Sequence, residues 1–445
     1  MREIGARELG PRRGAWAGIL LLAIVNGSLV ALLASPFVEN AAGRWADRRL
    51  VGGLDEKIAR LRKGPLVVTF RYANGTPAAG LRVNYSLVRH DFLFGCNFYE
   101  YQSLGERDAD YEEAFFRLFN YATLPIYWRT YEPNPGEFPR DAWLASALDR
   151  LSREGAKPKL HPVAWRNPAG YPDWLPGDPR LVTEALEARV DRLTSLYGGT
   201  AYAWDVVNEP THLPAFGTGD AFDYVNATFQ RTRAGDPDGL LVLNDYGILG
   251  HDFGGGPFYR LVRRLLDAGA PVDAIGFQGR EPRTDWTPAC EVWATLDAYA
   301  RLGLPIHVTE FCATSSPQLP VTNSWVKGTW SEEKQAAYVE TFYKTCFAHP
   351  AVEAITYWDL YDGRSWVTGA GLLREDWTPK PAYEALDRLV NEEWTTRGAA
   401  TLDPSGSLAL DAFYGEYEIL VPQLGVAFNV NHSRTGGSPS VLLLE

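Results

Sequence analysis

The chain has 445 residues, 46% of them hydrophobic, which is enough for a large core and for more than one domain. Its net charge of −12 argues against a nucleic-acid partner, because a polyanion requires a basic face, so we expect no nucleic-acid partner. The 15 tryptophans and 22 tyrosines favour a carbohydrate ligand, because aromatic rings stack on sugars, although the same rings could fill a large core. The four cysteines lack a CxxC spacing and the seven histidines form no HxH or HExxH cluster, so the sequence predicts no metal site.

The N-terminus carries a candidate membrane segment. Arg12 and Arg13 precede residues 14–38, which contain no charged side chain, and about 20 apolar residues are enough to cross a bilayer. A basic start before an apolar span is typical of a signal anchor with its basic end inside. We therefore predict that residues 1–39 form an uncleaved single-pass transmembrane anchor in the cell membrane, with the rest of the chain on the extracytoplasmic side. The alternative is a cleaved signal peptide and a secreted protein.

Short β segments are predicted on both sides of the central part of the chain. The residues after the anchor are charged, which indicates a short helix or stalk, and residues 65–88 alternate in the manner of strands. Asn74-Gly75 stands between two alternating runs and predicts a β-hairpin. We therefore assign residues 40–91 to a stalk and small β element, and residues 395–445, which return to short alternating runs, to a C-terminal β segment.

Residues 92–394 alternate between short apolar runs and helix-like stretches. Eight apolar runs, each followed by a helical or loop segment, are typical of a parallel sheet. Eight such units within about 300 residues favour an α/β fold of the closed (β/α)8 type, a TIM barrel, over an open doubly wound sheet. No GxGxxG follows the first run, so a dinucleotide-binding fold is not indicated. The runs are residues 92–96, 122–127, 159–165, 201–209, 240–246, 274–278, 305–311 and 353–360.

Polar residues at the ends of the predicted strands are candidates for chemistry, because the carboxyl ends of the strands build the active face of such a barrel. Glu209 and Glu310 each end an otherwise apolar run, "WDVVNE" and "IHVTE". Two carboxyl groups on either side of a bond are what glycoside hydrolysis needs, because one must protonate the leaving oxygen while the other stays ionised. One glutamate at a strand end is more often a structural ion pair, but two on the fourth and seventh strands of one barrel favour chemistry.

Several motifs, in family order along the chain, resemble glycoside hydrolase family 10, whose type activity is endo-1,4-β-xylanase. "WDVVNEP" resembles its acid/base motif, which makes Glu209 the expected acid/base, and "HVTEF" resembles its nucleophile motif, which makes Glu310 the expected nucleophile. "HPVAW" resembles its third-strand motif and places His161 and Trp165 at the sugar of the cleaved bond. "LNDY", "IGFQ" and "YWDLYDGRSW" match its later strands. The resemblance implies a (β/α)8 barrel, double displacement with retention, and no metal or organic cofactor.

The candidate substrate-binding residues lie at the same strand ends as the two glutamates. They are His161, Trp165, Asn208, Gln278, Arg280, Arg166, Tyr127, Trp358 and Trp366. For His161, Trp358 and Trp366 the alternative is a plain core position. Asn244 and Asp245 are expected to be structural and to cap the turn after the fifth strand.

The sequence departs from the family at positions whose side chains bind the sugar in that family. Tyr127 stands where the family has lysine, and Arg166 and Arg280 stand where it has histidine. Arg280 beside Glu310 favours the ionised carboxylate, because a neighbouring cation stabilises the charged form. Two arginines in the cleft suggest a substrate with carboxylate groups, which arginine binds bidentately. The alternative is that these arginines pair with Asp245, Asp359 or Asp362.

The chain is therefore predicted to be a monomeric glycoside hydrolase that cleaves a β-linked polysaccharide or oligosaccharide, with xylan as the default substrate by resemblance. One alternative is the same mechanism on a different glycan, including an acidic one. The other is a non-catalytic barrel that binds a glycan at the cell surface; the two retained glutamates argue against it, and the lost lysine and histidines argue for it. Cys312 shares the strand face of Glu310 and could touch the site or form a disulfide with Cys290.

Overall fold

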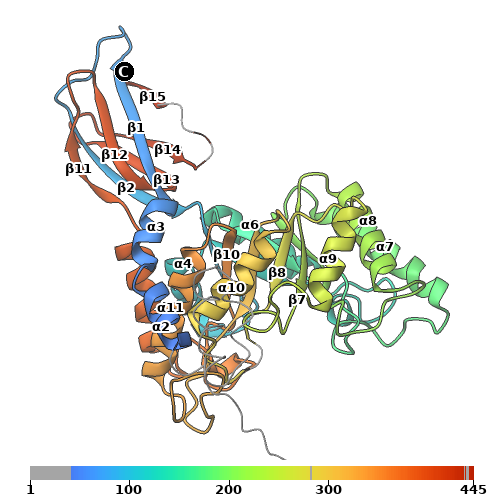
Figure 1. Cartoon of the computed structure of the whole chain (residues 1–445). Helices are drawn as coiled ribbons and strands as arrows, with labels where there is room; N and C mark the ends of the chain where they lie inside the picture. Colours follow the sequence, from blue (N-terminus) through green and yellow to red (C-terminus); the bar gives the residue numbers. More distant parts are fainter. Residues whose placement is uncertain (1–41, 281–282, 435, 437–439, 445) are drawn as a thin grey trace, which may run out of the picture.

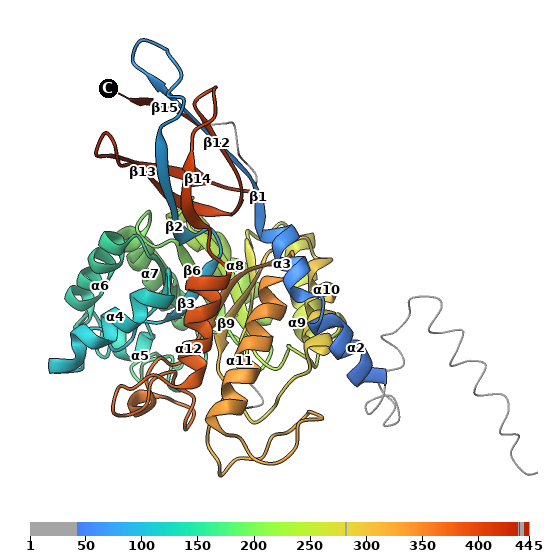
Figure 2. The same cartoon turned by 90° about the vertical axis from the view of Figure 1, so that its left-hand side faces the viewer.

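The computed structural model describes residues 42–280, 283–434, 436 and 440–444. Figure 1 shows two parts, a barrel surrounded by helices and a β-sandwich that projects beyond one end of the barrel. The same arrangement is visible from the side in Figure 2. The two parts have separate hydrophobic cores.

The central part is a closed barrel of eight parallel strands in the order β10-β3-β4-β5-β6-β7-β8-β9, so the predicted (β/α)8 barrel is confirmed. Each strand overlaps one predicted apolar run. Almost all strand residues are buried, because helices cover the outside of the barrel and side chains fill its inside, and such strands read as continuous apolar runs. The strands are β3 (Leu93–Asn97), β4 (Tyr121–Pro125), β5 (Lys157–His161), β6 (Ala203–Asn208), β7 (Leu240–Asp245), β8 (Ala274–Phe277), β9 (Ile306–Phe311) and β10 (Val352–Tyr357).

Helices between the strands form the outer layer of the barrel (Figures 1 and 2). In α7 the buried residues Val182, Leu186, Val190 and Leu193 recur every three or four positions, which turns one apolar stripe toward the barrel. The helices are α4 (Asp108–Leu118), α5 (Trp128–Tyr131), α6 (Asp141–Glu154), α7 (Pro179–Tyr197), α8 (Ala221–Gly235), α9 (Pro257–Asp267), α10 (Ala289–Ala300), α11 (Glu332–Phe347) and α12 (Pro381–Arg388), with short turns η2 (Gly105–Arg107), η3 (Asp362–Arg364) and η4 (Leu389–Glu393).

The β-sandwich unites the two predicted β segments from opposite ends of the chain. One sheet has the order β12-β1-β15 and the other the order β11-β2-β13-β14. Every second residue of β1, including Leu66, Val68 and Phe70, is buried against Tyr417 and Ile419 of the other sheet in a common core. The strands are β1 (Lys63–Tyr72), β2 (Arg82–His90), β11 (Arg397–Thr401), β12 (Ser407–Phe413), β13 (Gly415–Val421), β14 (Val426–His432) and β15 (Ser440–Leu444).

The predicted hairpin at Asn74-Gly75 is wrong. A turn does form there, with Gly75 at φ 83°, and it closes a short antiparallel bridge between Arg71 and Pro77. The following strand β2 then joins the other sheet, where it pairs with β11 and β13 and not with β1. The turn residues fixed the local reversal but not the partner of the next strand.

The charged residues before the sandwich form two helices, α2 (Ala42–Val51) and α3 (Leu54–Arg62), that pack on the barrel. The Arg62 guanidinium donates hydrogen bonds to the carbonyls of Phe347, His349 and Val352 at 2.8, 3.0 and 2.7 Å. The predicted anchor, residues 1–39, lies outside the described residues. Among the helices of the described ranges, none combines the length and apolar character needed to cross a membrane.

Candidate active site

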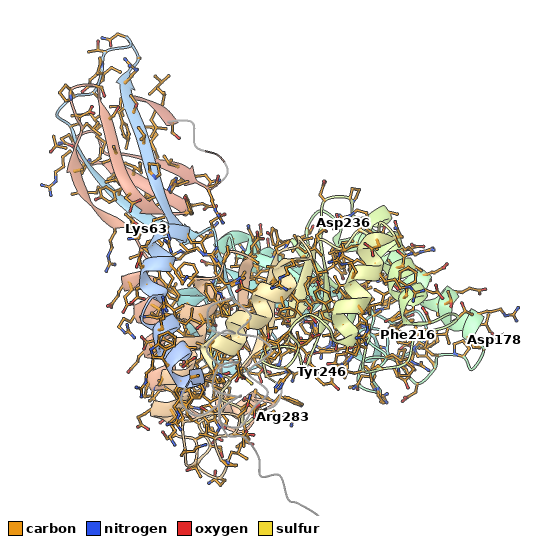
Figure 3. All side chains as sticks on the ribbon, viewed as in Figure 1. Lys63, Asp178, Phe216, Asp236, Tyr246 and Arg283 are labelled. Carbon is orange, nitrogen blue, oxygen red and sulfur yellow. The ribbon has the colours of Figure 1, made fainter. Side chains whose placement is uncertain are left out.

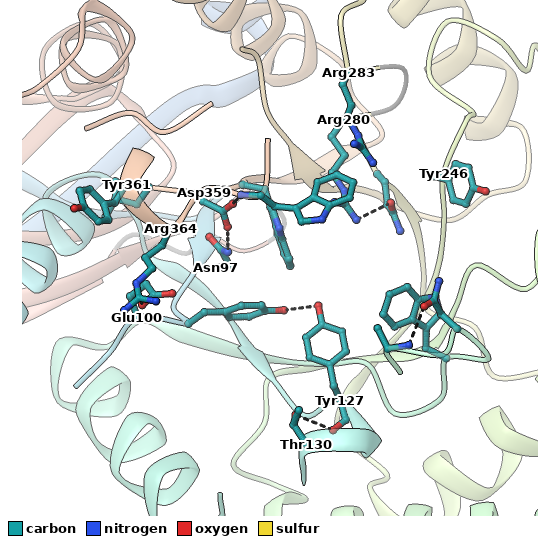
Figure 4. A pocket seen from close by; sticks show the side chains of 18 of the residues that line it. Asn97, Glu100, Tyr127, Thr130, Tyr246, Arg280, Arg283, Asp359, Tyr361 and Arg364 are labelled. Atoms are coloured by element: carbon teal, nitrogen blue, oxygen red, sulfur yellow. Dashed lines mark hydrogen bonds and ion pairs between the residues drawn. The ribbon is translucent and has the colours of Figure 1, made fainter. Parts of the chain in front are cut away.

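A cleft of about 710 Å³ opens at the carboxyl ends of the barrel strands. Figure 3 shows this end through Tyr246, which directly follows β7, and Arg283; the sandwich, which begins at Lys63, lies beyond the opposite end. Figure 4 shows the cleft from close by. Its lining residues are Asn97, Tyr99, Glu100, Tyr111, Tyr127, Thr130, Trp165, Asn167, Ala169, Glu209, Tyr246, Gln278, Arg280, Arg283, Trp358, Asp359, Leu360, Tyr361, Arg364 and Trp366.

Glu209 lines this cleft directly after β6, with 6% of its surface exposed. Its backbone has a left-handed φ of 57°, which is strained for a non-glycine residue, and its N–H donates to the carbonyl of Asn244 at 2.8 Å. The carboxylate accepts hydrogen bonds from Trp165 Nε1 at 2.8 Å and from Gln278 Nε2 at 2.9 Å. Burial raises the pKa of Glu209; the two hydrogen bonds partly offset this, and the nearby Glu310 adds to the rise.

Glu310 lies on β9 with 1% of its surface exposed. Its Oε2 lies 2.6 Å from Nη2 of Arg280, and its Oε1 accepts a hydrogen bond from Asn244 Nδ2 at 3.2 Å. His161 Nε2 is 4.0 Å from the same Oε1. The expected contact of Arg280 with this glutamate is therefore present. Arg280 lines the cleft, whereas Glu310 is not among the lining residues.

A chain of amide side chains connects the two glutamates. Gln278 Nε2, which bonds Glu209, also donates to Asn208 Oδ1 at 3.3 Å. Asn244 Nδ2 donates to the same Asn208 oxygen at 2.8 Å and reaches Glu310. Asn208 and Gln278 thus lie at the glutamates as predicted. Asn244, which we expected to be structural, is a member of the site that the prediction missed; its place at a strand end was the available clue.

His161 is held in the barrel by a buried carboxylate. Its Nδ1 lies 2.7 Å from Asp205 Oδ2, which also lies 2.9 Å from Lys159 Nζ. Burial alone would raise the pKa of Asp205, but Lys159 and His161 outweigh burial and hold it below its usual value. The arrangement turns Nε2 of His161 toward Glu310. Asp205 was not among the predicted site residues.

Aromatic side chains form much of the cleft wall. The hydroxyl groups of Tyr127 and Tyr99 are 3.2 Å apart, and the Tyr127 ring contacts that of Trp165. Trp358 also lines the cleft, although only 6% of it is exposed. Trp366 is 52% exposed, so the alternative of a core position is wrong for this residue. Tyr99 was missed because it stands in the loop after the first barrel strand.

The structure corrects the prediction for Arg166. Its guanidinium lies over the rings of Tyr171 and Phe216, at 4.8 and 5.1 Å from their centres, and Arg166 is not among the residues that line the cleft. The stacking draws the side chain away from the site, because a planar guanidinium is favoured on an aromatic face.

The alternative partners of the two arginines have other contacts. Asp245 accepts hydrogen bonds from Thr211 and His212, which lie in the loop after β6. It also accepts one from the backbone N–H of Tyr246, which helps to hold the turn after β7 as expected. Asp359 accepts hydrogen bonds from Asn97 Nδ2 and from the backbone N–H of Trp366. Asp362 forms an ion pair with Lys380. Cys312 and Cys290 lie in the described part of the chain and neither forms a disulfide, so the disulfide alternative is wrong.

Fold and site together define a class of protein. A (β/α)8 barrel with two buried, linked carboxyl groups at the carboxyl ends of its strands, one of them lining an aromatic cleft, is the arrangement of a glycoside hydrolase. Residues 88–388 match the family model that is described as "Glycosyl hydrolase family 10". This range contains all eight barrel strands, and the chain therefore belongs to glycosyl hydrolase family 10.

Individual relatives are distant in sequence. Endo-1,4-beta-xylanase B of Thermotoga neapolitana is 29% identical over 262 residues, which are 53% of this chain and 70% of that protein. The anti-sigma-I factor RsgI6 of Acetivibrio thermocellus is 26% identical over 415 residues; these are 91% of this chain but only 50% of that protein. The crystal structure of xylanase 10B from Thermotoga petrophila RKU-1 in complex with xylobiose has 25% sequence identity and a TM-score of 0.58, and the similarity covers 68% of this chain and 95% of that one.

Proposed function

We propose that this chain hydrolyses a β-linked polysaccharide of the xylan type by double displacement, with Glu209 as the acid/base and Glu310 as the nucleophile. The observation that carries the proposal is the amide chain through Gln278, Asn208 and Asn244, which ties the two glutamates into one network at the active end of the barrel. The family and the xylanase relatives support the same reaction class.

The different surroundings of the two glutamates support these two roles. Glu209 lines the cleft and its pKa is raised, chiefly by burial, so it keeps a proton that it can give to the leaving oxygen. Glu310 pairs with Arg280 and accepts a hydrogen bond from Asn244, and these contacts hold its carboxylate in place for attack on the anomeric carbon. After the first displacement, Glu209 as a carboxylate removes a proton from the water that releases the sugar.

The cleft supports a sugar ligand through its rings and its fixed donors. Trp165, Tyr127 and Trp358 offer aromatic faces, and Gln278 is positioned by hydrogen bonds before substrate arrives. His161 and Asn208 are held beside the glutamates but are not among the residues that line the cleft. Tyr127, which replaces the family's lysine, offers a hydroxyl and a ring in place of a cation. We therefore propose that binding at the cleaved-bond sugar depends more on stacking here than on an ammonium group.

The proposal is tested by the rate and the stereochemistry of hydrolysis of xylan and neutral β-1,4-oligosaccharides. Glu310→Gln should abolish turnover, and Glu209→Gln should lower kcat by about 10²–10⁴-fold on natural glycans. Glu209→Gln should lose much less on an aryl glycoside, whose leaving group needs no proton. Proton NMR should show the β-anomer as the first product. An α-anomer would contradict the mechanism, and a folded wild-type protein that binds glycans without turnover would favour the binding barrel.

We also propose that residues 14–38 anchor the protein in the cell membrane, with the barrel outside. The support is the sequence alone: Arg12 and Arg13 stand before an uncharged stretch long enough to span a bilayer.

A further inference from the structure

Helix α2 presents an aromatic and basic face to solvent. Trp45, Arg48 and Arg49 stand at positions i, i+3 and i+4 of the helix, so they share one face, and all three are exposed. The Arg49 guanidinium lies 5.4 Å from the centre of the Trp45 ring. The other face packs on α10, where Asp47, the one acidic residue of α2, accepts a hydrogen bond from the Cys290 N–H at 3.0 Å. The acidic side chain therefore points into the protein, and both arginines point away from it.

The exposure of Trp45 is not explained by the cleft. Among the described tryptophans, only Trp45 and Trp366 have more than half of their surface exposed, at 62% and 52%. Trp366 lines the cleft, where an exposed ring can stack on a sugar. Trp45 is not a lining residue, and α2 lies on the outer side of the barrel beside α10 (Figure 2). A single exposed ring is common on protein surfaces, but here two exposed guanidinium groups share its face.

The place of α2 in the chain brings this face close to the proposed anchor. The uncharged stretch ends at residue 38 and α2 begins at Ala42, so the chain between them spans at most about 14 Å. A bilayer that holds residues 14–38 therefore lies within reach of the first turn of α2. Tryptophan is enriched at the membrane–water interface, because its ring is apolar and its N–H is polar. Arginine side chains near the surface are attracted to anionic lipid headgroups.

We propose that Trp45, Arg48 and Arg49 form a surface that binds anionic lipid headgroups. This inference rests on the proposed anchor and extends it, because a second contact with the bilayer fixes the orientation of the barrel. Cys290, which contacts α2, lies at the start of α10 and therefore at the cleft end of the barrel, where each helix begins after the carboxyl end of a strand. The lipid contact thus lies beside the cleft end, whereas α3 leads away from it to the sandwich (Figure 1).

Hydroxyl-radical footprinting of the intact chain in lipid nanodiscs tests this surface, with mass spectrometry to measure the oxidation of individual tryptophans. Trp366 is the internal control, because its exposed fraction is similar and it lies in the cleft. The ratio of Trp45 to Trp366 oxidation is compared between nanodiscs of phosphatidylcholine alone and nanodiscs that also contain phosphatidylglycerol. The ratio should be at least about three-fold lower with phosphatidylglycerol, since each arginine near an anionic surface strengthens the contact by about five-fold.

Two double variants show whether the arginines cause the difference. Arg48→Gln with Arg49→Gln removes both charges and keeps Trp45, so the oxidation ratio should become the same in the two lipids. Arg153→Gln with Arg180→Gln is the matched control, because it removes the same charge from exposed positions of α6 and α7, on the other side of the barrel (Figure 2). This control should keep the wild-type dependence on phosphatidylglycerol.

Equal oxidation ratios of the wild type in the two lipids would refute the lipid-binding surface and leave the anchor intact. A difference that persists in Arg48→Gln with Arg49→Gln would refute it as well, because the arginines would then have no part in it. Failure of the anchor gives another result, since the intact chain would not enter nanodiscs. Sedimentation of the chain with phosphatidylglycerol vesicles would then test the surface, and equal sedimentation of the wild type and this double variant would refute it.

Discussion

Glu209 and Glu310 have the same side chain but different neighbours. Glu209 is bonded by an indole N–H and an amide, both uncharged, whereas Glu310 is paired with a guanidinium. Burial raises the pKa of Glu209, so the proton needed for leaving-group departure is kept to higher pH. The basic limb of the pH profile of kcat/KM should therefore report Glu209.

Trp165→Phe tests this assignment. The Trp165 N–H stabilises the charged carboxylate and so lowers the pKa of Glu209; without it the pKa rises further. Activity is lost as pH rises through this pKa, so the basic limb of the profile should move to higher pH by about one unit in Trp165→Phe. The maximum of kcat/KM should be lower than in the wild type. Trp366→Phe, which leaves both hydrogen bonds of Glu209 in place, is the control. A downward shift in Trp165→Phe would contradict the role of Glu209 as the acid.

At the scale of elements, the site depends on side chains that cross between neighbouring strands. Asn208 on β6, Asn244 on β7 and Thr309 on β9 are joined in series, with Thr309 Oγ1 donating to Asn244 Oδ1 at 2.6 Å. The threonine fixes which end of the Asn244 amide faces Glu310. Three strands thus contribute to the position of one carboxylate.

Asn244→Ala should lower kcat by about ten-fold or more, because a buried hydrogen bond to a charged group is worth about 1.5–3 kcal/mol. Thr309→Val removes only the group that orients the amide, so kcat should fall less and in the same direction. Steady-state kinetics on xylo-oligosaccharides provide the measurement. An Asn244→Ala enzyme with wild-type kcat would show that the amide chain has no part in catalysis.

The three hydrogen bonds of the Arg62 guanidinium, which we call the Arg62 clamp, connect α3 to the end of α11 and the start of β10, away from the cleft. Arg62→Ala leaves three carbonyls without their donor and should lower the free energy of unfolding by about 2–3 kcal/mol with KM unchanged. Arg60→Ala on the exposed face of the same helix is the control. Denaturant unfolding measures the difference, and equal stability of the two variants would contradict the clamp.

The sequence could predict those elements whose burial pattern is visible within one continuous stretch of residues. Eight parallel strands covered on both faces give continuous apolar runs, so their number and order could be read directly. The alternation in β1 and β2 showed which face is buried but not which strand pairs with which, and the two strands entered different sheets. Sheet partners depend on distant segments, in this case the last part of the chain.

For the candidate site too, the sequence predicted the residues at strand ends but not the contacts that depend on other segments of the chain. Glu209 and Glu310 could be predicted because a carboxyl group that ends an apolar strand must lie at the rim of the barrel. The place of Arg166 could not be predicted, because it depends on two rings that hold the side chain away from the cleft, Tyr171 in the same loop and Phe216 in the loop after β6. Asn244 was missed because an asparagine at a strand end fits a turn as well as a site.

At the scale of the whole molecule, the barrel and the sandwich have largely separate cores, although Phe413 of β12 packs in the barrel core, and we expect them to unfold in two transitions. Tyr417 is fully buried in the sandwich, and its hydroxyl donates to the Phe413 carbonyl at 2.7 Å. Tyr417→Ala should destabilise the sandwich by about 3–5 kcal/mol. Calorimetry should show one transition that moves and one that stays, with hydrolysis retained. A single transition that moves as a whole would contradict the independence of the cores.

The proposed anchor predicts where the whole chain is found in cells. The intact protein should stay with the membrane fraction through a high-salt wash and a carbonate wash, because neither removes a bilayer-spanning segment. A chain that lacks residues 1–39 should be released. Release of the intact chain by carbonate would contradict the anchor.

The central claim is that Glu310 attacks the sugar while Glu209 first donates and then accepts the proton. Trapping the covalent intermediate tests it most directly. The enzyme is incubated with a 2-deoxy-2-fluoro β-xylobioside that carries a good leaving group, and its peptides are then analysed by mass spectrometry. We predict one glycosyl group per chain, attached to Glu310, and no adduct in Glu310→Gln. An adduct on any other residue, or turnover of xylan by an enzyme that forms none, would contradict the account.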